Sequence, residues 1–398
     1  VVDREDCLPP EARRSLAAVV VVADTLTALA DLGRAARQRL ACPVIAVTGS
    51  CGKTTVKEML GQILVRRLRG RRPPKSFNNQ VGVPLTLLAA EPADQFVLCE
   101  LGTNAPGEIA HLASIARPTI GIVTLVAPVH LEGLGSLEGV AEEKAALVDA
   151  LPADGVAILN ADDPRVAAMA GRCRGRVVTV GFSGEADLQA GHLIQTDLGL
   201  YFTASGPVGF ELPVLGEHQA VLALAAAAAA LEVGVPLDDS AEALRAFQPL
   251  PMRLAVEQAG QITVVNDAYN ANPVSMQAAL GLLALWPERR KVFFCGDMRE
   301  LGAESRSLHE ALGRAVVEAG VDRLVCVGPE SRATAEAARA AGMDREVATA
   351  MADAAAAAAL APRIVGDGDV VLVKGSRTVG MEKVVEAIAR AQASRGRT

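Results

Sequence analysis

A glycine-containing loop between an apolar run and a helix-forming segment constrains the fold of this chain more than any other feature. The run 44–47 reads Val-Ile-Ala-Val, the loop TGSCGKTT follows at 48–55, and a helical pattern extends over 53–66. A strand that leaves such a loop as a helix turns backbone N–H groups and the positive helix end toward one point. This order of elements predicts a parallel α/β domain with a phosphate-binding loop.

The residue types of the loop predict a nucleotide site. We expect the Lys53 ammonium to reach the β- and γ-phosphates and the Thr54 hydroxyl to ligate Mg²⁺. The general signature has a glycine where Val47 stands, so this loop is a shortened variant, and a loop that only turns the chain is the alternative. The cofactor-binding residues expected here are Thr48, Gly49, Ser50, Gly52, Lys53, Thr54 and Thr55. The pattern predicts a protein that uses ATP.

Length and composition narrow the class of protein. The chain has 398 residues, enough for two or three domains, and a net charge of −7, which argues against non-specific binding of nucleic acid. We find no signal peptide pattern and no apolar run of membrane-spanning length. The odd number of cysteines and the lack of a CxxC pair argue against a disulfide framework or zinc site: Cys7, Cys42, Cys51, Cys99, Cys173, Cys295 and Cys326. These features favour a soluble cytoplasmic enzyme.

Apolar runs of strand length alternate with helix-length periodic segments along most of the chain. Up to residue 250 we expect strands at 44–47, 96–99, 120–123, 156–159 and 177–180. Helices are expected at 53–66, 107–116, 138–151, 164–172, 218–233 and 239–247, with hairpins over 186–214. Residues 41–250 are therefore predicted to form a central P-loop ATPase-like domain on a parallel sheet.

Two prolines, Pro249 and Pro251, indicate a linker at 248–251, because they discourage continuing helix. Beyond it we expect strands at 262–265, 292–295, 324–327 and 370–373, and helices at 273–285, 303–319, 331–341 and 381–393. Residues 251–398 thus predict a second, Rossmann-like α/β domain. Residues 1–40 offer one strand, 19–22, and one helix, 26–39, which we interpret as the remnant of a longer N-terminal domain.

Two polar side chains follow expected strands, at the edge where a parallel sheet binds its ligands. Glu100 comes directly after 96–99 and is well placed to ligate Mg²⁺, although a capping or solvated glutamate fits the same pattern. His130 lies beyond the strand 120–123 and suits either a metal ligand or a structural histidine.

Lys144 lies on the apolar face of the helix expected at 138–151. Glu142 and Glu143 are expected to point elsewhere, whereas the neighbours of Lys144 on its face are Val140, Ala141, Leu147, Val148 and Leu151. The lysine either extends from the edge of that face into water or is a desolvated amine with a depressed pKa. A neutral amine can add CO₂ and become a carbamate, which is an anionic ligand for Mg²⁺.

Polar clusters also follow three strands of the last third. The run 266–273 contains Asp267, a candidate for holding ribose hydroxyls, and an Asn-Pro pair that would equally cap a helix. The runs 296–302 and 374–377 follow two further strands. The substrate-binding residues that we expect in these three runs are Asn270, Asn272, Asp297, Lys374, Ser376 and Arg377.

Taken together, the motifs resemble those of the Mur ligases, the ATP-dependent amide-forming enzymes of bacterial cell-wall synthesis. The matching segments occur in the family's order. They are TGSCGKTT (48–55), FNNQVGVP (77–84), ELGTNAPGEI (100–109), HLEG (130–133), NADDP (160–164), NDAYNANPVSM (266–276), GDMRELG (296–302) and VKGSR (373–377). Each is a weak or moderate signal alone, and the set is highly specific.

The chain looks most like the family member that adds D-alanyl-D-alanine to UDP-N-acetylmuramoyl-tripeptide. The resemblance implies that ATP phosphorylates the tripeptide carboxylate and that the dipeptide amine attacks the resulting acyl phosphate. It also implies a monomer that closes its C-terminal domain over the central one. The implied catalytic residues are Lys53, Lys144 and His130. The resemblance implies two Mg²⁺ ions, the first held by Thr54 and the second by Glu100, His130 and a carbamylated Lys144. The further nucleotide contacts that it implies are His218, Arg253 and Asp267. Asn78 and Asn79 of the FNNQVGVP segment are implied to bind substrate.

Two departures from the family leave other functions open. Gln219 and Leu222 stand where the family has the two asparagines of a His-Asn-x-x-Asn pattern, which predicts altered or looser adenine recognition. About 43 residues precede the nucleotide strand, where the family has a full UDP-sugar-binding domain. The chain would then be a fragment, or a ligase for a smaller carboxylate without a UDP anchor. A nucleotide-binding protein without ligase activity is the third alternative, which the presence of the second-metal residues disfavours.

Overall fold

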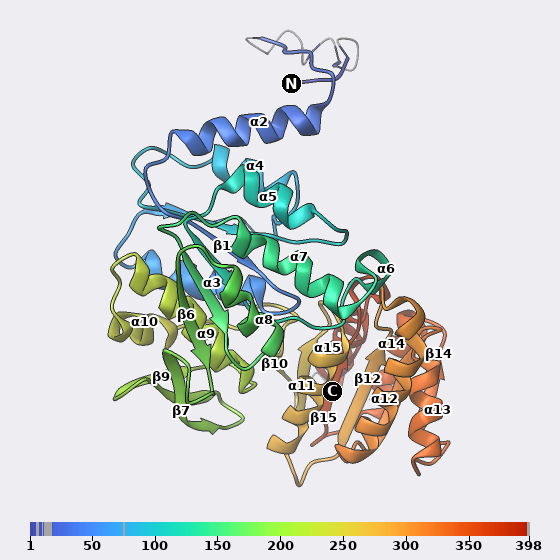
Figure 1. The fold of residues 1–398 in the computed structure, drawn as a ribbon. Coiled ribbons are helices and arrows are strands. Elements are labelled where there is room, and N and C mark those ends of the chain that lie inside the picture. Colours follow the sequence, from blue (N-terminus) through green and yellow to red (C-terminus); the bar gives the residue numbers. More distant parts are fainter. Residues whose placement is uncertain (5–7, 10, 12–17, 75, 396–398) are drawn as a thin grey trace. The chain divides into compact units, whose positions relative to one another are not determined.

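The computed structural model describes the whole chain except residues 5–7, 10, 12–17, 75 and 396–398. The chain folds into two compact units, whose elements are labelled in Figure 1. The first comprises Val1–Leu125, Ala141–Gln189 and Leu222–Ala243, and the second comprises Val126–Val140, Ala190–Val221 and Leu244–Thr398. Three segments of the expected central domain, 126–140, 190–221 and 244–250, thus belong to the second unit, and the domain boundaries at residues 41 and 251 stay a prediction.

Six parallel strands in the order β2-β3-β1-β4-β5-β6 form the centre of the first unit. They belong to a nine-stranded sheet, in which β6 pairs in parallel with the next strand, β7 (Leu188–Gln195). All residues of β1, β3, β4 and β5 are buried, as expected for parallel strands covered on both faces. Because β1 pairs with β3 and β4, the carboxyl ends of these three strands meet at one edge. The strands are β1 (Val44–Thr48), β2 (Gly70–Arg71), β3 (Phe96–Glu100), β4 (Ile120–Val123), β5 (Val156–Asn160) and β6 (Arg176–Gly181).

The helices up to residue 250 follow the predicted alternation, with two additions. The short helices α4 (Gly82–Leu88) and α6 (Leu131–Leu134) have no helical signal long enough to have been expected. The others are α2 (Thr25–Gln38), α3 (Lys53–Leu64), α5 (Glu108–Ala116), α7 (Leu137–Asp149), α8 (Pro164–Ala168), the 3₁₀ turn η2 (Met169–Arg172), α9 (His218–Glu232) and α10 (Leu237–Leu244).

The strand expected at 19–22 is wrong. Only Val21 pairs, in a single parallel bridge to Val2. Val20 and Val21 are 55% and 52% exposed, so no sheet or helix among the described residues covers the β-branched side chains that suggested a strand. The helix expected at 26–39 is confirmed as α2.

The second unit contains the expected hairpins and a six-stranded sheet. The hairpin strands β7 (Leu188–Gln195), β8 (Leu200–Ala204) and β9 (Val208–Leu212) pair antiparallel. The sheet has the order β10-β11-β15-β12-β13-β14, and only β10 runs antiparallel to its neighbour. Its strands are β10 (Ala255–Ala259), β11 (Ile262–Asp267), β12 (Lys291–Gly296), β13 (Arg323–Val327), β14 (Ala348–Met351) and β15 (Val370–Lys374). The two edge strands, β10 and β14, were not expected, because they are half-exposed and rich in residues with weak strand propensity.

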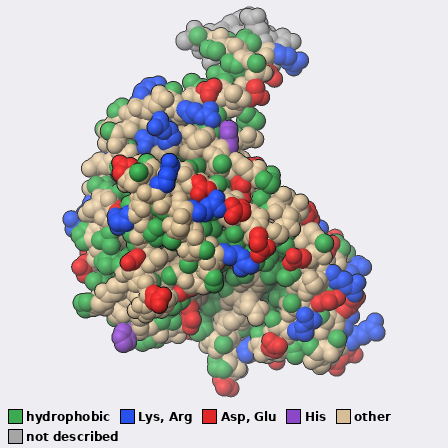
Figure 2. All heavy atoms as spheres, viewed as in Figure 1, with side chains coloured by type: hydrophobic (Ala, Val, Ile, Leu, Met, Phe, Trp, Pro, Cys, Tyr) green, Lys and Arg blue, Asp and Glu red, His purple; other side chains and the backbone are tan. Residues whose placement is uncertain are grey.

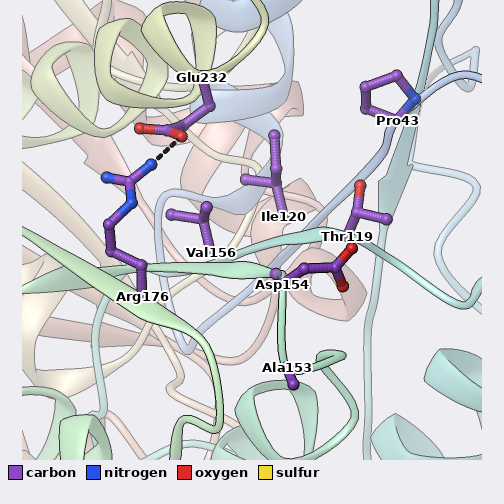
Figure 3. Close-up of a pocket in the computed structure, with 9 residues that line it drawn as sticks. Pro43, Thr119, Ile120, Ala153, Asp154, Val156, Arg176 and Glu232 are labelled. Carbon is purple, nitrogen blue, oxygen red and sulfur yellow. Dashed lines mark hydrogen bonds and ion pairs between the residues drawn. The ribbon is translucent and has the colours of Figure 1, made fainter.

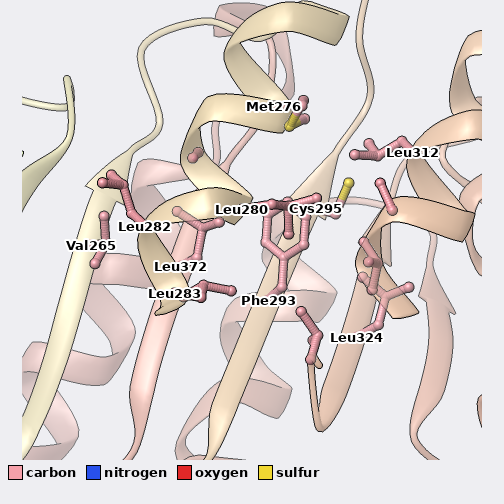
Figure 4. Packing of buried hydrophobic residues seen from close by; sticks show 14 of the residues in the cluster. Val265, Met276, Leu280, Leu282, Leu283, Phe293, Cys295, Leu312, Leu324 and Leu372 are labelled. Atoms are coloured by element: carbon pink, nitrogen blue, oxygen red, sulfur yellow. The ribbon is translucent and has the colours of Figure 1, made fainter. Parts of the chain in front are cut away.

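Helices cover both faces of this second sheet, and each face has its own core. Apolar residues of α11, η3, α12 and α13 pack on one face around Phe293, Leu324 and Leu372, as Figure 4 shows. Residues of α14 and α15 pack on the other face around Phe294 and Val371. The helical elements are α6 (Leu131–Leu134), α11 (Pro273–Gly281), η3 (Leu282–Leu285), η4 (Gly302–Glu304), α12 (Ser305–Glu318), α13 (Arg332–Ala340), α14 (Ala354–Ile364), η5 (Arg377–Val379) and α15 (Glu382–Arg395). The doubly wound architecture predicted for this region is confirmed.

The surface and the cysteines agree with the composition. Figure 2 shows acidic and basic side chains interspersed over the visible face, without a large area of one sign. All six cysteines within the described residues are free thiols, and Cys7 lies outside those residues. In the described part of the chain, we find no helix that combines the length and apolar character needed to cross a membrane.

Candidate active site

The predicted phosphate loop connects β1 to α3 at the carboxyl edge of the first sheet. Gly49 and Gly52 adopt φ angles of 140° and 83°, a region that favours glycine. A Cβ on Gly49 would lie 2.0 Å from the Thr124 Oγ1, and one on Gly52 would lie 2.6 Å from the Leu222 Cδ2. The loop therefore requires glycine at both positions, for its backbone conformation and for close packing.

Thr124, which sequence reasoning missed, braces the loop from the end of β4. Its hydroxyl donates to the carbonyl oxygens of Cys51 and Thr48. The Ser50 N–H donates to the Leu125 carbonyl at 2.7 Å. Lys53, the first residue of α3, donates to the Gly49 carbonyl at 2.6 Å, which folds its ammonium back over the loop. The loop is thus held in shape by main-chain and hydroxyl contacts that leave the start of α3 facing its concave side.

Glu100 and Thr54 meet beside this loop, as their positions in the sequence predict. Glu100 is the last residue of β3 and is 1% exposed. Its Oε1 accepts from the Thr54 hydroxyl at 3.2 Å and from the Asn78 Nδ2 at 3.0 Å. Asn78, expected to bind substrate, therefore supports the Glu100 carboxylate. Asn79, its exposed neighbour, accepts from the Val81 and Gly82 N–H groups with its side chain, which stabilises the start of α4.

These residues fit Mg²⁺, the metal that the sequence predicts. A hydroxyl and a carboxylate are hard oxygen ligands of the kind Mg²⁺ prefers. The Glu100 Oε2 is buried and accepts no hydrogen bond from the described residues. Within those residues, no three His, Cys, Asp and Glu side chains converge into a metal site. The remaining ligands would be phosphate oxygens and water, which is usual for Mg²⁺ bound with a nucleotide.

Lys57 is a second residue beside the loop that sequence reasoning missed. It lies one helical turn after Lys53, and its side chain is fully buried. Its Nζ lies 3.7 Å from the Glu100 Oε2 and 3.0 Å from the Glu58 Oε1, and donates to the Pro73 carbonyl at 3.4 Å. The signal in the sequence was its i+4 spacing from Lys53, which places both lysines on one side of α3.

The structure buries Lys144, as the apolar face of its helix predicts. Lys144 is 1% exposed on α7, and its neighbours Val140, Leu147 and Val148 are fully buried. Burial, followed by repulsion from the Lys53 ammonium, lowers the pKa of Lys144 to about 7. The influence of Lys53 places this amine near the phosphate loop. A large share of the Lys144 side chains would then be neutral near pH 7, the form that reacts with CO₂.

Glu143, expected to point away from the apolar face, is in fact buried and ties α7 to the loop that follows β3. Its carboxylate accepts from the Gly107 and Ile109 N–H groups, both at 2.7 Å, and from the Thr103 hydroxyl at 3.1 Å. Glu142 is exposed and pairs with Arg172. Glu143 therefore caps the start of α5 and holds the helix that carries Lys144 against the segment that carries Glu100.

His130 lies in the second unit, whereas Glu100 and Lys144 lie in the first. It precedes α6 with a φ of 53°, and its Nδ1 pairs with the carboxylate of Glu300, whose φ is 64°. The Glu132 N–H also donates to the Glu300 carbonyl, at 3.4 Å. A carboxylate partner of this kind orients a metal-ligating imidazole in many proteins. Glu300 belongs to the GDMRELG run, which had suggested only Asp297 as a site residue.

The carboxyl ends of β11 and β15 bring Asp267 and Lys374 together in the second unit. The Lys374 Nζ lies 2.5 Å from the Asp267 Oδ2 and donates to the Asn270 carbonyl at 2.9 Å. The Asp267 Oδ1 accepts from the Leu254 N–H at 3.2 Å, and burial raises the pKa of this carboxyl. Arg253 stacks on the Tyr269 ring, 4.0 Å from its centroid.

Three other expected substrate residues are held by internal partners. Asn270 and Arg377 are exposed, and Arg377 pairs with Glu382 at 3.2 Å. Asp297 is fully buried, accepts from the Ser331 N–H at 2.8 Å and pairs with Arg299 at 2.9 Å. The Ser376 hydroxyl accepts from the Arg299 N–H at 2.9 Å. Asn272 caps α11 in a capping box with Ser275. In this structure, these side chains hold the strand ends in place.

Replacing Asn272 by alanine is expected to lower the free energy of unfolding by about 1 kcal/mol, because the Ser275 N–H loses its acceptor. Chemical denaturation of both proteins measures this. Asn272→Asp keeps the acceptor and should retain most of the stability. If the aspartate variant is stable but loses catalytic activity, Asn272 also contacts substrate; if the alanine variant unfolds like the parent, the cap contributes nothing.

The segment expected to meet the nucleotide base begins α9. His218 is exposed, and Gln219 is buried with an amide oxygen that accepts no hydrogen bond from the described residues. Leu222, one turn further along, packs on Gly52 of the phosphate loop. Its apolar side chain thus has a packing role at the loop.

A cavity of about 320 Å³ lies at the opposite end of the first sheet (Figure 3). It opens at the amino ends of β4, β5 and β6, where Arg176 pairs with Glu232. Parallel sheets bind their ligands at the carboxyl ends of the strands, and the lining includes none of the predicted site residues. We therefore do not assign this cavity to the predicted reaction.

Comparison of the sequence with protein families and known relatives agrees with the site described above. Residues 47–230 match the Mur ligase middle domain, and residues 252–377 match the glutamate ligase domain of the Mur ligases. The chain is 38% identical to the UDP-N-acetylmuramoyl-tripeptide–D-alanyl-D-alanine ligase of Escherichia coli K12, over 93% of this chain and 82% of that protein. It is 34% identical to the enzyme of the same name from Bacillus subtilis, over 96% of this chain and 83% of that protein.

Solved structures give the same result. MurF from Acinetobacter baumannii superposes with a TM-score of 0.85 and 31% identity, covering 98% of this chain and 84% of that one. MurF from Thermotoga maritima in complex with ADP superposes with a TM-score of 0.85 and 25% identity, covering 96% of this chain and 87% of that one. The predicted arrangement of two α/β sheets is therefore confirmed.

Proposed function

The chain belongs to the Mur ligase family of ATP-dependent ligases, and we propose that it joins D-alanyl-D-alanine to UDP-N-acetylmuramoyl-tripeptide. The product is a peptidoglycan precursor. The observation that carries this proposal is the joint presence of the phosphate loop, a buried Glu100 beside Thr54, and a buried Lys144 near Lys53. A protein that only binds nucleotide has no need for the last two. The proposal places the reaction in the cytoplasm, where ATP is available, with the monomer as the acting unit.

The phosphate loop would hold ATP through its backbone N–H groups and the Lys53 ammonium. Lys53 now donates to the Gly49 carbonyl and would exchange that contact for the β- and γ-phosphates. Thr54 and Glu100 would hold Mg²⁺, which supplies charge neutralisation as the carboxylate approaches the γ-phosphate. The tripeptide carboxylate would displace ADP to form an acyl phosphate. The dipeptide amine would then attack its carbonyl carbon and release phosphate.

Lys144 would enter this site as a carbamate. Its neutral nitrogen attacks CO₂, a proton leaves, and the cationic side chain becomes an anionic one. The lowered pKa and the burial of the amine support this step, because both favour the uncharged nucleophile. Glu143 would hold Lys144 in position. His130, oriented by Glu300, would complete the set of Mg²⁺ ligands. Arg253 and Asp267 would contact the nucleotide from the second unit.

The decisive experiment is a ligation assay followed by mass spectrometry. The full chain is incubated with ATP, Mg²⁺, D-alanyl-D-alanine and UDP-N-acetylmuramoyl-tripeptide, and ADP is followed in parallel. We expect a UDP-linked pentapeptide and one ADP for each product molecule. ADP release without pentapeptide, or product only from a smaller carboxylate offered in place of the UDP-linked peptide, would refute the proposed substrate.

A further inference from the structure

Lys57 and Glu100 form an ion pair of unusual geometry inside the first unit. Both side chains are buried, at 0% and 1% exposure. The two charges face each other at 3.7 Å, beyond hydrogen-bond length, on the Glu100 Oε2. This is the oxygen that accepts no hydrogen bond from the described residues. Thr54 and Asn78 both donate to the other oxygen, Oε1.

The two oxygens of the Glu100 carboxylate therefore have different roles. Thr54 and Asn78 set the orientation of Glu100 through Oε1. Lys57 balances its charge through space and leaves the lone pairs of Oε2 unoccupied. A buried carboxylate without a nearby cation would carry a large desolvation cost. The Lys57 ammonium is itself kept in place by Glu58 and by the Pro73 carbonyl, so it stays beside Oε2 without closing onto it.

We propose that Lys57 is a positioning residue that acts as the resident countercharge of Glu100. It stabilises the carboxylate while no metal is bound. When a divalent cation occupies Oε2, its repulsion by the ammonium weakens metal binding and favours release of Mg²⁺ with ADP after each turnover. The assignment rests on the proposed function for the identity of the nucleotide, but the Lys57–Glu100 pair itself can be tested without substrate.

The test compares Lys57→Met with the parent protein, because methionine fills the volume of the lysine stem without its charge. In EDTA we expect the Tm of Lys57→Met to fall by about 5 °C or more, since Glu100 is then buried without a cation. With Mg²⁺ and ADP added, the variant should regain most of this loss. Calorimetric titration of Mg²⁺ into the ADP-bound protein should show a Kd about tenfold lower than in the parent.

Two further variants control for simple loss of packing. Lys57→Met with Glu100→Gln removes both charges and should recover much of the Tm lost in EDTA. Glu58→Gln removes the other, more exposed partner of Lys57 and should change the Tm in EDTA by much less.

Two results would overturn the assignment. One is an equal loss of Tm with and without Mg²⁺ and ADP. The other is a double variant no more stable than Lys57→Met alone. If the variants show the expected changes in Tm but the parent protein makes no pentapeptide, the proposed substrate is refuted and the role of Lys57 stands.

Discussion

Lys144→Ala is expected to lower the rate of pentapeptide formation by at least roughly 10²- to 10³-fold. The change removes an amine that is buried near Lys53 and that is suited to carry a carbamate. ATP binding should stay within about threefold of the parent, because the phosphates are held by the loop and Lys53. Single-turnover ligation measures the first quantity, and equilibrium binding of a fluorescent ATP analogue measures the second.

A carbamate on Lys144 would make the ligation rate depend on CO₂. The parent enzyme should lose activity in degassed, bicarbonate-free buffer and regain it when bicarbonate is added. Lys144→Ala should not respond to bicarbonate, whereas a short carboxylic acid added in place of the carbamate should restore part of its activity. Lys383→Ala, at an exposed lysine on α15, is the matched control and should behave like the parent. A Lys144→Ala variant with parental rates would remove Lys144 from the mechanism.

Gly49→Ala is expected to weaken ATP binding by at least about 100-fold, a loss of about 2.7 kcal/mol. The added methyl would lie 2.0 Å from the Thr124 Oγ1, and the φ of 140° is one that alanine rarely adopts. To relieve the clash with Thr124 or the backbone strain, the loop would have to move away from Thr124. This movement would open the ring of N–H groups that would surround the phosphates. Titration with the ATP analogue measures the affinity, and thermal unfolding measures the accompanying loss of stability.

Gly206→Ala, in the turn between β8 and β9, is the control for backbone strain alone. Gly206 has a φ of 126°, and a Cβ there would meet no atom within 4 Å. It should lower the free energy of unfolding by about 1–3 kcal/mol and leave ATP affinity unchanged. If Gly49→Ala binds ATP as well as Gly206→Ala does, the loop is not the phosphate site.

The predictable features of this protein are local ones. The order apolar run, TGSCGKTT, helix is enough to predict β1, the loop and α3, because a strand, a turn and a helix each depend on neighbouring residues. Periodicity places Lys144 on the buried face of α7 for the same reason. Errors occur where tertiary context overrides pattern. The valines at 19–22 suggest a strand but join no sheet of the described residues, and the edge strand β14 forms despite its weak strand propensity.

The sequence by itself determined the nucleotide loop, the alternation of strands and helices, and the family. It also determined which strand ends carry Glu100, Asp267 and Lys374, since side chains directly after buried strands must emerge at one edge of a parallel sheet. Only the tertiary structure decided how those side chains pair. Lys57 approaches Glu100 from 43 positions away in the chain, and Glu143 reaches the start of α5 from 34 to 36 positions away. Such distances are set by packing of whole elements, so no local pattern encodes them.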